Sequence, residues 1–362
     1  MNLVFNQEDI ARASKDLALL IDKSSTVPIL SNVCVRVTGD VATFTATNLD
    51  QQASITVPVE SDCDDAFTIP GDKLASISGA AKVELSMEFK DGFVTAKSGK
   101  SKWKLPTLAV ADFPVLRDDI DGTSFEIDSE RLKGLFENVA GAMSIEEARY
   151  YLRGIYVHSV NGNLKLATTD GRVLSAIECD DIKYGGPGVI VPAGNVAQVI
   201  KMMAGYNGPV TVTIGERVSY QYGNVTLSSK VVDGSFPDYQ RVIDGSANND
   251  KIVRFARADM AASIKRATIL ADEKTRAINL DIGKGRIVLT VAASDGGVAT
   301  DEVPCEYAGE PFKYRCNGVY LANQINAAGD EVEIAGFDEN SPIRLTSSSN
   351  KGYVGILMGM RI

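Results

Sequence analysis

The stretch ADFPVLRD at residues 111–118 returns as GSFPDYQR at residues 234–241, and this recurrence decides how the chain is divided. Phe113 and Phe236 lie 123 residues apart. A Phe-Pro pair carries no chemistry by itself, so its return matters only if the surrounding sequence repeats as well. Proline cannot continue strand pairing and fixes φ, which suits a crossing between two domains with the phenylalanine as its anchor. A binding role for Pro237 is the alternative.

Further landmarks repeat with an offset of 122 residues. They pair Ile10 with Leu132, Thr47 with Thr169, and Pro70 with Pro192. The last third follows at offsets of 125 to 128 residues from the second, at Met260, Ser294 and Asn317. The sequence therefore predicts three copies of one unit, at residues 1–121, 122–246 and 247–362.

Each copy has the pattern of an α+β unit. In the second copy, a spacing of three and four residues makes one apolar helical stripe of Leu132, Leu135, Phe136, Val139 and Met143. The turn at Asn161-Gly162 separates two alternating stretches and predicts a β-hairpin. We expect two helices and roughly eight strands per copy, with the helices on one face of an antiparallel sheet.

Composition limits the classes of function. The formal charge of -10 opposes tight, non-specific DNA binding, which needs basic side chains. The five cysteines are widely spaced and form no Cys-x-x-Cys, so we expect reduced core thiols in a cytoplasmic protein. The chain has no apolar run of membrane-spanning length. Its first residues, MNLVFNQEDI, lack the pattern of a signal peptide.

Motifs for catalysis or metal binding are scarce. His158 is the only histidine, and we expect it at the surface of a strand. One histidine without paired cysteines argues against a zinc site, and we expect no metal or other cofactor. A Ser-His-Asp arrangement stays open, but no Gly-x-Ser-x-Gly supports it. The segment SGKS at residues 98–101 has Val94 where a phosphate-binding loop needs glycine, so we expect a hairpin and an exposed basic strand there.

The ending GILMGMRI is unusually apolar. Ile356, Met358 and Met360 alternate along what we expect to be a last strand. These side chains belong either to the core or to an adaptable binding surface, for which methionine is well suited.

Six ordered stretches resemble one known family. They are VPILSN at 27–32, ARYYLRGI at 148–155, ATTDGRVLS at 167–175, SKVVDGSFPDYQRV at 229–242, ADEKTRAINL at 271–280, and the ending MGMRI. Through its whole length, the chain resembles the bacterial-type sliding clamps, the beta subunits of DNA polymerase III. The resemblance implies a non-catalytic processivity factor. Two chains would join head to tail into a closed six-domain ring around duplex DNA, opened by a clamp loader.

The resemblance also implies three sets of functional residues. Helix residues facing DNA would be Lys15, Lys133, Lys201, Lys265 and Arg266, with Lys23 in a basic loop. Ordinary solvated helix charges are the alternative for the helix residues. The dimer interface would set Lys73, Trp103 and Leu105 against Ile269 and Leu270. Glu146 and Glu147 stand where a second loop of the family contacts DNA, and they would not attract phosphate.

The third set is a cleft in which the replicative polymerase and repair proteins dock short linear peptides. By resemblance it comprises Leu152, Thr169, Gly171, Arg172, Val173, Leu174, Pro237, Arg241, Val242, Pro342, Ile356, Met358, Met360 and Arg361. Arg172-Val173 stands where a His-Arg pair is frequent, and Gly359 where proline is common, so peptide preference is expected to differ.

Two other functions remain open at this point. One is a clamp-like paralogue that serves repair or a phage, which a depletion test would separate by the persistence of bulk DNA synthesis. The other is an enzyme on a repeated α+β scaffold, which a hydrolase or nuclease screen would reveal.

Overall fold

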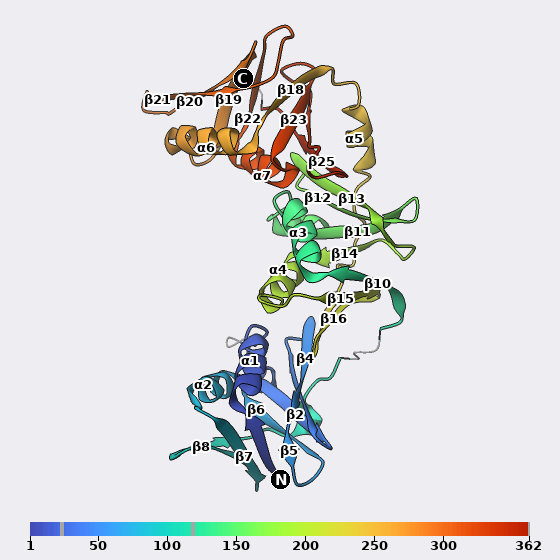
Figure 1. Cartoon of the computed structure of the whole chain (residues 1–362), viewed down its shortest axis with the longest axis vertical. Coiled ribbons are helices and arrows are strands. Elements are labelled where there is room, and N and C mark those ends of the chain that lie inside the picture. The colour runs from blue at the N-terminus through green and yellow to red at the C-terminus, as the bar shows by residue number, and fades with distance from the viewer. Residues whose placement is uncertain (22–24, 117–119, 361–362) are drawn as a thin grey trace. The chain divides into compact units, whose positions relative to one another are not determined.

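The computed structural model describes residues 1–21, 25–116 and 120–360. Helices accompany antiparallel sheets, which confirms the expected α+β class (Figure 1). The chain divides into two compact units, one made of Met1–Ser129 and Gly194–Val231, the other of Glu130–Ala193 and Val232–Ile362. Both units take part of the middle copy of the repeat, and the expected boundaries after residues 121 and 246 stay a prediction.

The first unit holds two sheets. The five-stranded sheet has the order β5 (Glu60–Ser61), β1 (Asn2–Asn6), β7 (Glu84–Lys90), β8 (Phe93–Ser98) and β9 (Ser101–Pro106). The eight-stranded sheet has the order β10 (Gly122–Asp128), β15 (Pro209–Gly215), β16 (Arg217–Tyr222), β17 (Val225–Lys230), β4 (Gln51–Pro58), β3 (Val41–Thr47), β2 (Asn32–Thr38) and β6 (Asp65–Pro70). This larger sheet joins strands of the first and second copies where β17 pairs with β4.

The second unit repeats this arrangement. Its eight-stranded sheet has the order β14 (Val189–Pro192), β11 (Gly154–Val160), β12 (Asn163–Thr169), β13 (Val173–Lys183), β25 (Tyr353–Leu357), β24 (Ile343–Thr346), β23 (Glu331–Gly336) and β18 (Lys251–Ala256). The four-stranded sheet has the order β21 (Val298–Pro304), β20 (Arg286–Ala292), β19 (Ala277–Gly283) and β22 (Phe312–Asn317). The second and third copies join where β13 pairs with β25.

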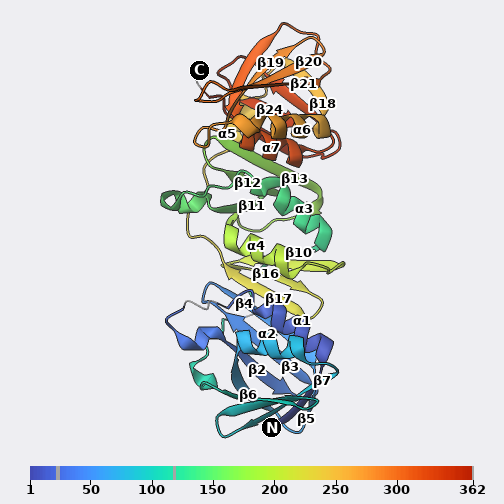
Figure 2. The ribbon, with the colours of Figure 1, turned by 90° about the vertical axis from the view of Figure 1, so that its left-hand side faces the viewer.

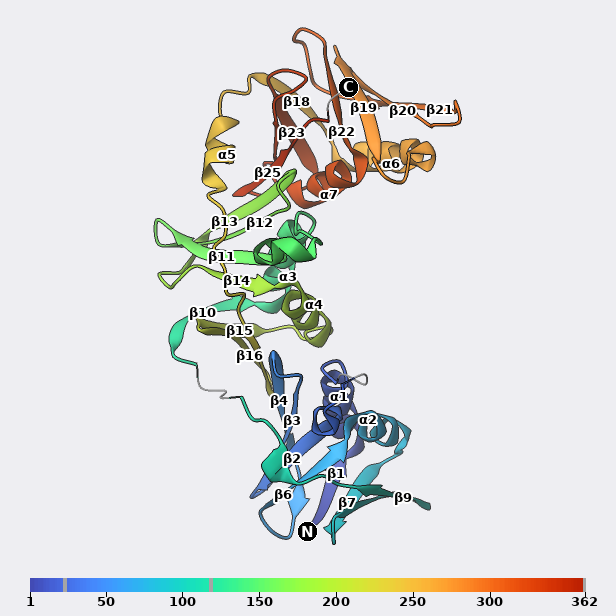
Figure 3. The ribbon, with the colours of Figure 1, turned by 180° about the vertical axis from the view of Figure 1, so that it is seen from behind.

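The helices pack on these sheets through apolar stripes. Those mainly in the first unit are α1 (Gln7–Leu17), α2 (Gly71–Ala80) and α4 (Ala193–Met202), and those mainly in the second are α3 (Ser129–Ala140), α5 (Gln240–Gly245), α6 (Arg257–Ala267) and α7 (Gly318–Ala328). Figure 2 shows α1 and α2 side by side over strands of the first unit. In the second unit, α6 and α7 lie on one side of the strands and α5 on the other (Figure 3).

Helix starts follow the local sequence. The Asn6 side chain accepts hydrogen bonds from the backbone of Glu8 and Asp9 and caps α1. Asn317 caps α7, the second helix of the third copy, in the same way. The 3₁₀ turns are η1 (Pro28–Ser31), η2 (Val110–Asp112), η3 (Glu147–Leu152) and η4 (Thr268–Leu270).

Local predictions from the sequence are mostly confirmed. Asn161 and Gly162 have φ of 51° and 80° and close the hairpin between β11 and β12. In α3, the expected stripe is buried from Leu132 to Val139. The helix ends at Ala140, so the expectation that Met143 belongs to this helix is wrong.

Both Phe-Pro pairs anchor a crossing, as expected. Phe113 is 5% exposed and packs with Ile29, Leu30 and Cys34. Phe236 stacks on Tyr156, with ring centroids 4.9 Å apart and planes 8° from parallel. The segments that follow β9 and β17 are therefore each fixed by one aromatic ring.

All five cysteines are free thiols. Cys34, Cys179 and Cys316 are buried, as expected for core thiols. Cys63 is exposed and Cys305 is half-buried, so the expectation is wrong for Cys63. Within residues 1–21, 25–116 and 120–360, the helices are too short or too polar to span a membrane.

Candidate functional site

A cavity of about 570 Å³ opens beside the turn between β12 and β13. Its walls come from this turn, the segment before β19, the start of α7 and the end of the chain. The lining residues are Gly171, Arg172, Lys274, Thr275, Asn317, Tyr320, Met358, Gly359 and Met360. Its volume lies in the range of ligand sites. It brings together four members of the predicted cleft, Gly171, Arg172, Met358 and Met360.

The turn at the cavity is held by its own side chains. The Thr169 hydroxyl donates to the Val173 carbonyl at 2.7 Å and accepts from the Gly171 amide at 3.0 Å. Asp170 Oδ1 accepts from the amides of Arg172 and Val173 at 2.8 and 3.0 Å. Gly171 has a φ of +89°, which favours glycine. The turn therefore presents the exposed Arg172 side chain in a fixed place.

Two outside groups brace the same turn. Arg149 of η3 donates from Nη1 to the Asp170 carbonyl at 2.8 Å. The hydroxyl of Tyr320 on α7 donates to Asp170 Oδ2. Burial, followed by the bond to Asp170, raises the pKa of Tyr320, so the hydroxyl remains a donor at neutral pH. Glu146, expected not to attract phosphate, pairs with Arg149 at 2.6 Å.

The chain end departs from the expected strand. β25 stops at Leu357, so Ile356, Met358 and Met360 do not alternate along one strand, and that expectation is wrong. The tail is held instead by the Met358 amide, which donates to the Arg172 carbonyl at 3.0 Å, and by the Met360 amide, which donates to the Arg315 carbonyl at 2.7 Å. Met358 is 42% exposed, while Ile356 is buried.

An apolar cluster lies along β12, β13 and β25. It contains Ala167, Leu174, Ala176, Tyr239, Ile243 and Ile356, with Tyr156, Phe236 and Val354 packed against it. Tyr239 and Ile243 come from the crossing segment, residues 232–246. Three predicted cleft residues on this segment, Pro237, Arg241 and Val242, are exposed.

The remaining predicted cleft residues are less accessible. Leu152, Val173 and Thr169 are buried. Pro342 is half-buried, and its carbonyl accepts from Asn249 Nδ2 at 2.9 Å. Arg361 lies outside the described residues. As one peptide site, the set stays a prediction.

His158 is not the surface residue that the sequence suggested. It is half-buried, its ring stacks on Tyr156 at 4.5 Å, and its Nε2 lies 2.7 Å from the Tyr239 hydroxyl. Tyr239 comes from a segment far along the chain, which the strand pattern around His158 could not reveal.

The predicted DNA-facing cations differ in their surroundings. Lys15, Lys201 and Lys265 are exposed in the last turns of α1, α4 and α6. Lys133 lies 2.7 Å from Glu130, and Arg266 lies 2.5 Å from Asp301. Each of these two cations is therefore paired with a carboxylate of the same chain. Lys23 lies outside the part of the chain that the structure describes.

The predicted interface residues lie at strand and helix edges. Trp103 and Leu105 are half-buried on β9, an edge strand, and Lys73 is exposed on α2. Ile269 and Leu270 in η4 are 79% and 38% exposed. The two neighbouring side chains of η4 form a small exposed apolar surface.

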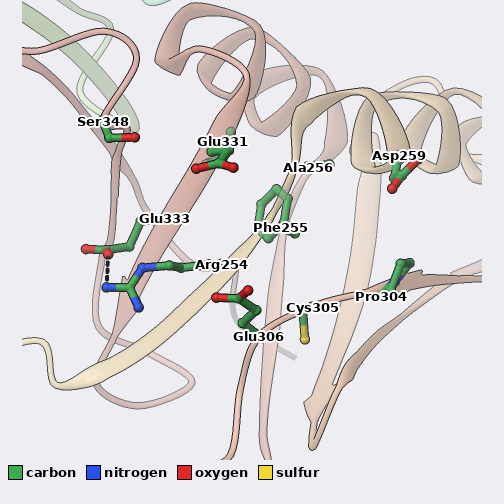
Figure 4. Close-up of a pocket in the computed structure, with 11 residues that line it drawn as sticks. Arg254, Phe255, Ala256, Asp259, Pro304, Cys305, Glu306, Glu331, Glu333 and Ser348 are labelled. Atoms are coloured by element: carbon green, nitrogen blue, oxygen red, sulfur yellow. Dashed lines mark ion pairs between the residues drawn. The ribbon is translucent and has the colours of Figure 1, made fainter.

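A separate cavity of about 430 Å³ lies between β18, β23 and the end of β21 (Figure 4). Arg254 pairs with Glu333 at 2.6 Å, and Asp259, Glu306 and Glu331 add three carboxylates. No residue of this cavity was predicted as a site. In the described ranges, no group of three or more His, Cys, Asp or Glu could hold a metal ion.

Sequence reasoning missed four residues that line the cavity at the turn. Lys274 and Thr275 lie in ADEKTRAINL, which carries the family resemblance. Asn317 and Tyr320 lie in RCNGVYLANQI, which supplied a landmark of the repeat. The family resemblance and the repeat drew attention to these two segments, but neither pattern indicated that they face the β12–β13 turn.

Comparison with known proteins places the whole chain in one family. Models of the DNA polymerase III beta subunit match residues 1–117 with the N-terminal domain, 126–238 with the central domain and 246–361 with the C-terminal domain. The beta sliding clamp of Caulobacter vibrioides (strain NA1000 / CB15N) is 33% identical, with 100% of each chain covered.

Solved structures agree. The DNA polymerase III subunit beta from Pseudomonas aeruginosa matches with a TM-score of 0.94 and 27% identity over 100% of both chains. A sliding clamp from Bartonella birtlesii bound to griselimycin matches with a TM-score of 0.93 and 28% identity, again over 100% of both chains. The chain therefore belongs to the DNA polymerase III beta subunit family, the DNA sliding clamps, which are processivity factors without catalytic activity.

Proposed function

We propose that two copies of this chain join head to tail around duplex DNA in the cytoplasm and hold partner proteins there through the cleft at the β12–β13 turn. The partners are a clamp loader, the replicative DNA polymerase and repair proteins that carry short linear peptides. The clamp raises their effective concentration at DNA and performs no reaction itself.

The repeat itself supports closure between two copies. Inside the chain, the last strand of the second copy, β17, pairs with β4 of the first. The last strand of the third copy, β25, pairs in the same way with β13 of the second. The corresponding strands that remain are β9, the last strand of the first copy, and β21, the strand of the third copy that matches β4 and β13. Both are edge strands of their sheets. Because open edges invite pairing, β9 of one copy is suited to β21 of another.

The internal registers also indicate which residues meet. Val225 opposes Ile55 at one junction, and Tyr353 opposes Ile177 at the other. The same step of the repeat puts Trp103 on β9 of one copy beside β21 of its partner. Leu270 lies beside this strand, because a Cβ added at Gly297 would lie 3.5 Å from its Cδ1. Trp103 and Leu105 would thus cover the exposed Ile269 and Leu270.

The cleft fits an extended peptide. The apolar cluster and the two methionines supply a hydrophobic surface, and Arg172, Lys274 and Tyr320 supply polar groups at its side. Apolar pockets with a few placed polar groups are typical of short-peptide recognition. The observation that carries this proposal is the meeting of Arg172, Met358 and Met360 at one cavity.

Contact with DNA needs to be only weak. A topologically closed clamp does not rely on affinity, and strong contacts would oppose sliding. The exposed Lys15, Lys201 and Lys265 would supply screened, sequence-independent attraction despite the net charge of -10.

Fluorescence polarisation of a labelled peptide of the Gln-Leu-x-Leu-Phe type tests the cleft. The double variant Met358→Ala, Met360→Ala should weaken binding at least about tenfold, because apolar anchors dominate such interfaces. Val319→Ala, which truncates an exposed side chain of α7 outside the cavity, is the matched control. Undiminished binding by the double variant would place the peptide elsewhere.

A further inference from the structure

We propose that a third cavity, beside the apolar cluster, binds an acidic side chain that flanks the docking motif of a partner peptide, with Arg344 as its counter-ion. The inference rests on the proposed function, because the peptide must first occupy the cleft. The cavity has a volume of about 400 Å³ and is lined by Lys165, Ala176, Glu178, Asp180, Ile243, Arg344, Lys351, Gly352 and Val354.

This cavity continues the surface on which the peptide is proposed to lie. Leu174 opposes Ile356 and Ala176 opposes Val354, so these four side chains share one face of the β13–β25 junction. Ala176 and Val354 line the cavity, while Leu174 and Ile356 belong to the predicted cleft. All four pack in or against the same apolar cluster.

The distance suits a peptide flank. Arg344 opposes Ile356, and Ile356 opposes Leu174, so Arg344 lies two strand spacings, about 10 Å, across the sheet from Leu174. An extended chain advances about 3.4 Å per residue, so about three residues cover this length. The acidic residue is therefore expected within about three positions of the apolar motif.

The charges lining the cavity leave a positive excess. Lys165 is 8% exposed, and its Nζ lies 3.6 Å from Glu178 Oε2 and 3.2 Å from Gln240 Oε1. This pair is satisfied within the protein. Asp180 adds one carboxylate, against the two cations Arg344 and Lys351.

Arg344 is the side chain of this cavity that is best suited to bind an anion. Its backbone lies in the ladder of β24, opposite Ile356. Its Nε is buried and has no hydrogen-bond partner, and its guanidinium forms no ion pair within the described ranges. A buried donor without a partner is costly, and a carboxylate can satisfy a guanidinium with two parallel bonds. A basic flank would meet the same cation and be repelled.

The test uses one docking motif with four added residues that are all neutral, or contain one aspartate, or contain one lysine, at either end. We expect the aspartate peptide to bind about fivefold more tightly than the neutral one, at one end of the motif only. The gain should shrink as salt is raised. Arg344→Gln should remove the gain and leave the affinity for the neutral peptide unchanged, which also reports that the variant is folded.

Two further variants sharpen the result. Asp180→Asn should increase the preference for aspartate, because it removes a carboxylate from the cavity. Lys284→Gln, at the exposed turn between β19 and β20, should change nothing and controls for net charge. An aspartate preference that persists in Arg344→Gln would overturn this site. Failure of the neutral peptide to bind the unaltered protein would instead overturn the proposed cleft, and this site with it.

Discussion

At the scale of residues, a row of side chains across three strands holds the crossing segment. His158 opposes Lys165, and Lys165 opposes Glu178, on neighbouring strands. His158 bonds to the Tyr239 hydroxyl, and the Lys165 ammonium bonds to Gln240. The exposed residues of the crossing segment that are predicted to belong to the cleft therefore depend on polar groups beneath it.

The environment of His158 in this row makes the free energy of unfolding depend on pH. Burial lowers the pKa of His158 from its ordinary value of 6.5, and the Lys165 ammonium adds to the effect, against the opposing influences of the Ser159 carbonyl and Glu178. The unfolded chain therefore takes up a proton near pH 6.5, while the folded protein does so only at lower pH. By linkage, the free energy of unfolding must fall as pH drops below 6.5.

Urea unfolding of the unaltered protein and of His158→Gln, at pH 7.5 and 5.5, checks this prediction. Because the chain has one histidine, the substitution removes the whole histidine contribution while carboxylates titrate in both proteins. The unaltered protein should lose more stability on acidification than the variant. Equal losses in both proteins would show that the pKa of His158 is the same in the folded and unfolded states.

At the scale of elements, a buried polar bridge ties α7 to the β13–β25 junction. Gln324 donates from Nε2 to the Ser175 hydroxyl at 2.7 Å, and its Oε1 accepts from the Tyr353 hydroxyl at 2.8 Å. A Cβ at Gly355 would lie 1.8 Å from that Oε1. The glycine thus allows the bridge to form beneath the strand that leads to the predicted cleft.

Gly355→Ala should lower the free energy of unfolding by about 2 kcal/mol, because the Gln324 amide must move and leave buried partners unpaired. Gly134→Ala in α3 is the control, since nothing lies within 4 Å of a Cβ added there. That control should be neutral or mildly stabilising. Equal stability of Gly355→Ala and the unaltered protein in urea would contradict the role given to the bridge.

The proposed seam makes a second prediction at this scale. Trp103→Glu should convert dimers to monomers, because it would bury an unpaired charge at the edge of β9. Val83→Glu, at an apolar position of the first unit that is 77% exposed, is the control. Light scattering gives the mass of each protein. A dimeric Trp103→Glu variant would reject this seam.

Elements and repeats could be predicted from the sequence because their signals are local. The Asn161-Gly162 turn, the α3 stripe and the Phe-Pro anchors each depend on neighbouring residues. The pairing of β13 with β25 joins residues nearly 180 positions apart, and no local pattern records it. For the same reason, the sequence did not reveal the contact of Tyr320 with Asp170.

At the scale of the whole molecule, corresponding positions of the repeat carry different charges. Five residues after the landmarks Ile10, Leu132 and Met260 stand Lys15, Glu137 and Lys265. Two copies thus present a cation in the last turn of the first helix and one presents a carboxylate. Attraction to DNA should therefore be modest for the full chain.

Binding to short linear duplex DNA should accordingly be weak and should fall as salt is raised, because it depends on the release of few counter-ions. Fluorescence polarisation of a labelled duplex at low and physiological salt measures this. Tight binding whose affinity does not change with salt concentration would contradict a sliding mode.

The central claim is that this protein is held on DNA by topology. The most direct measurement loads it onto nicked circular DNA with its clamp loader, washes at high salt, and then cuts the circle once with a restriction enzyme. Retention on the circle and release after cutting is the predicted result. Loss from the intact circle at high salt, or retention on the linear product with free ends, would contradict the account.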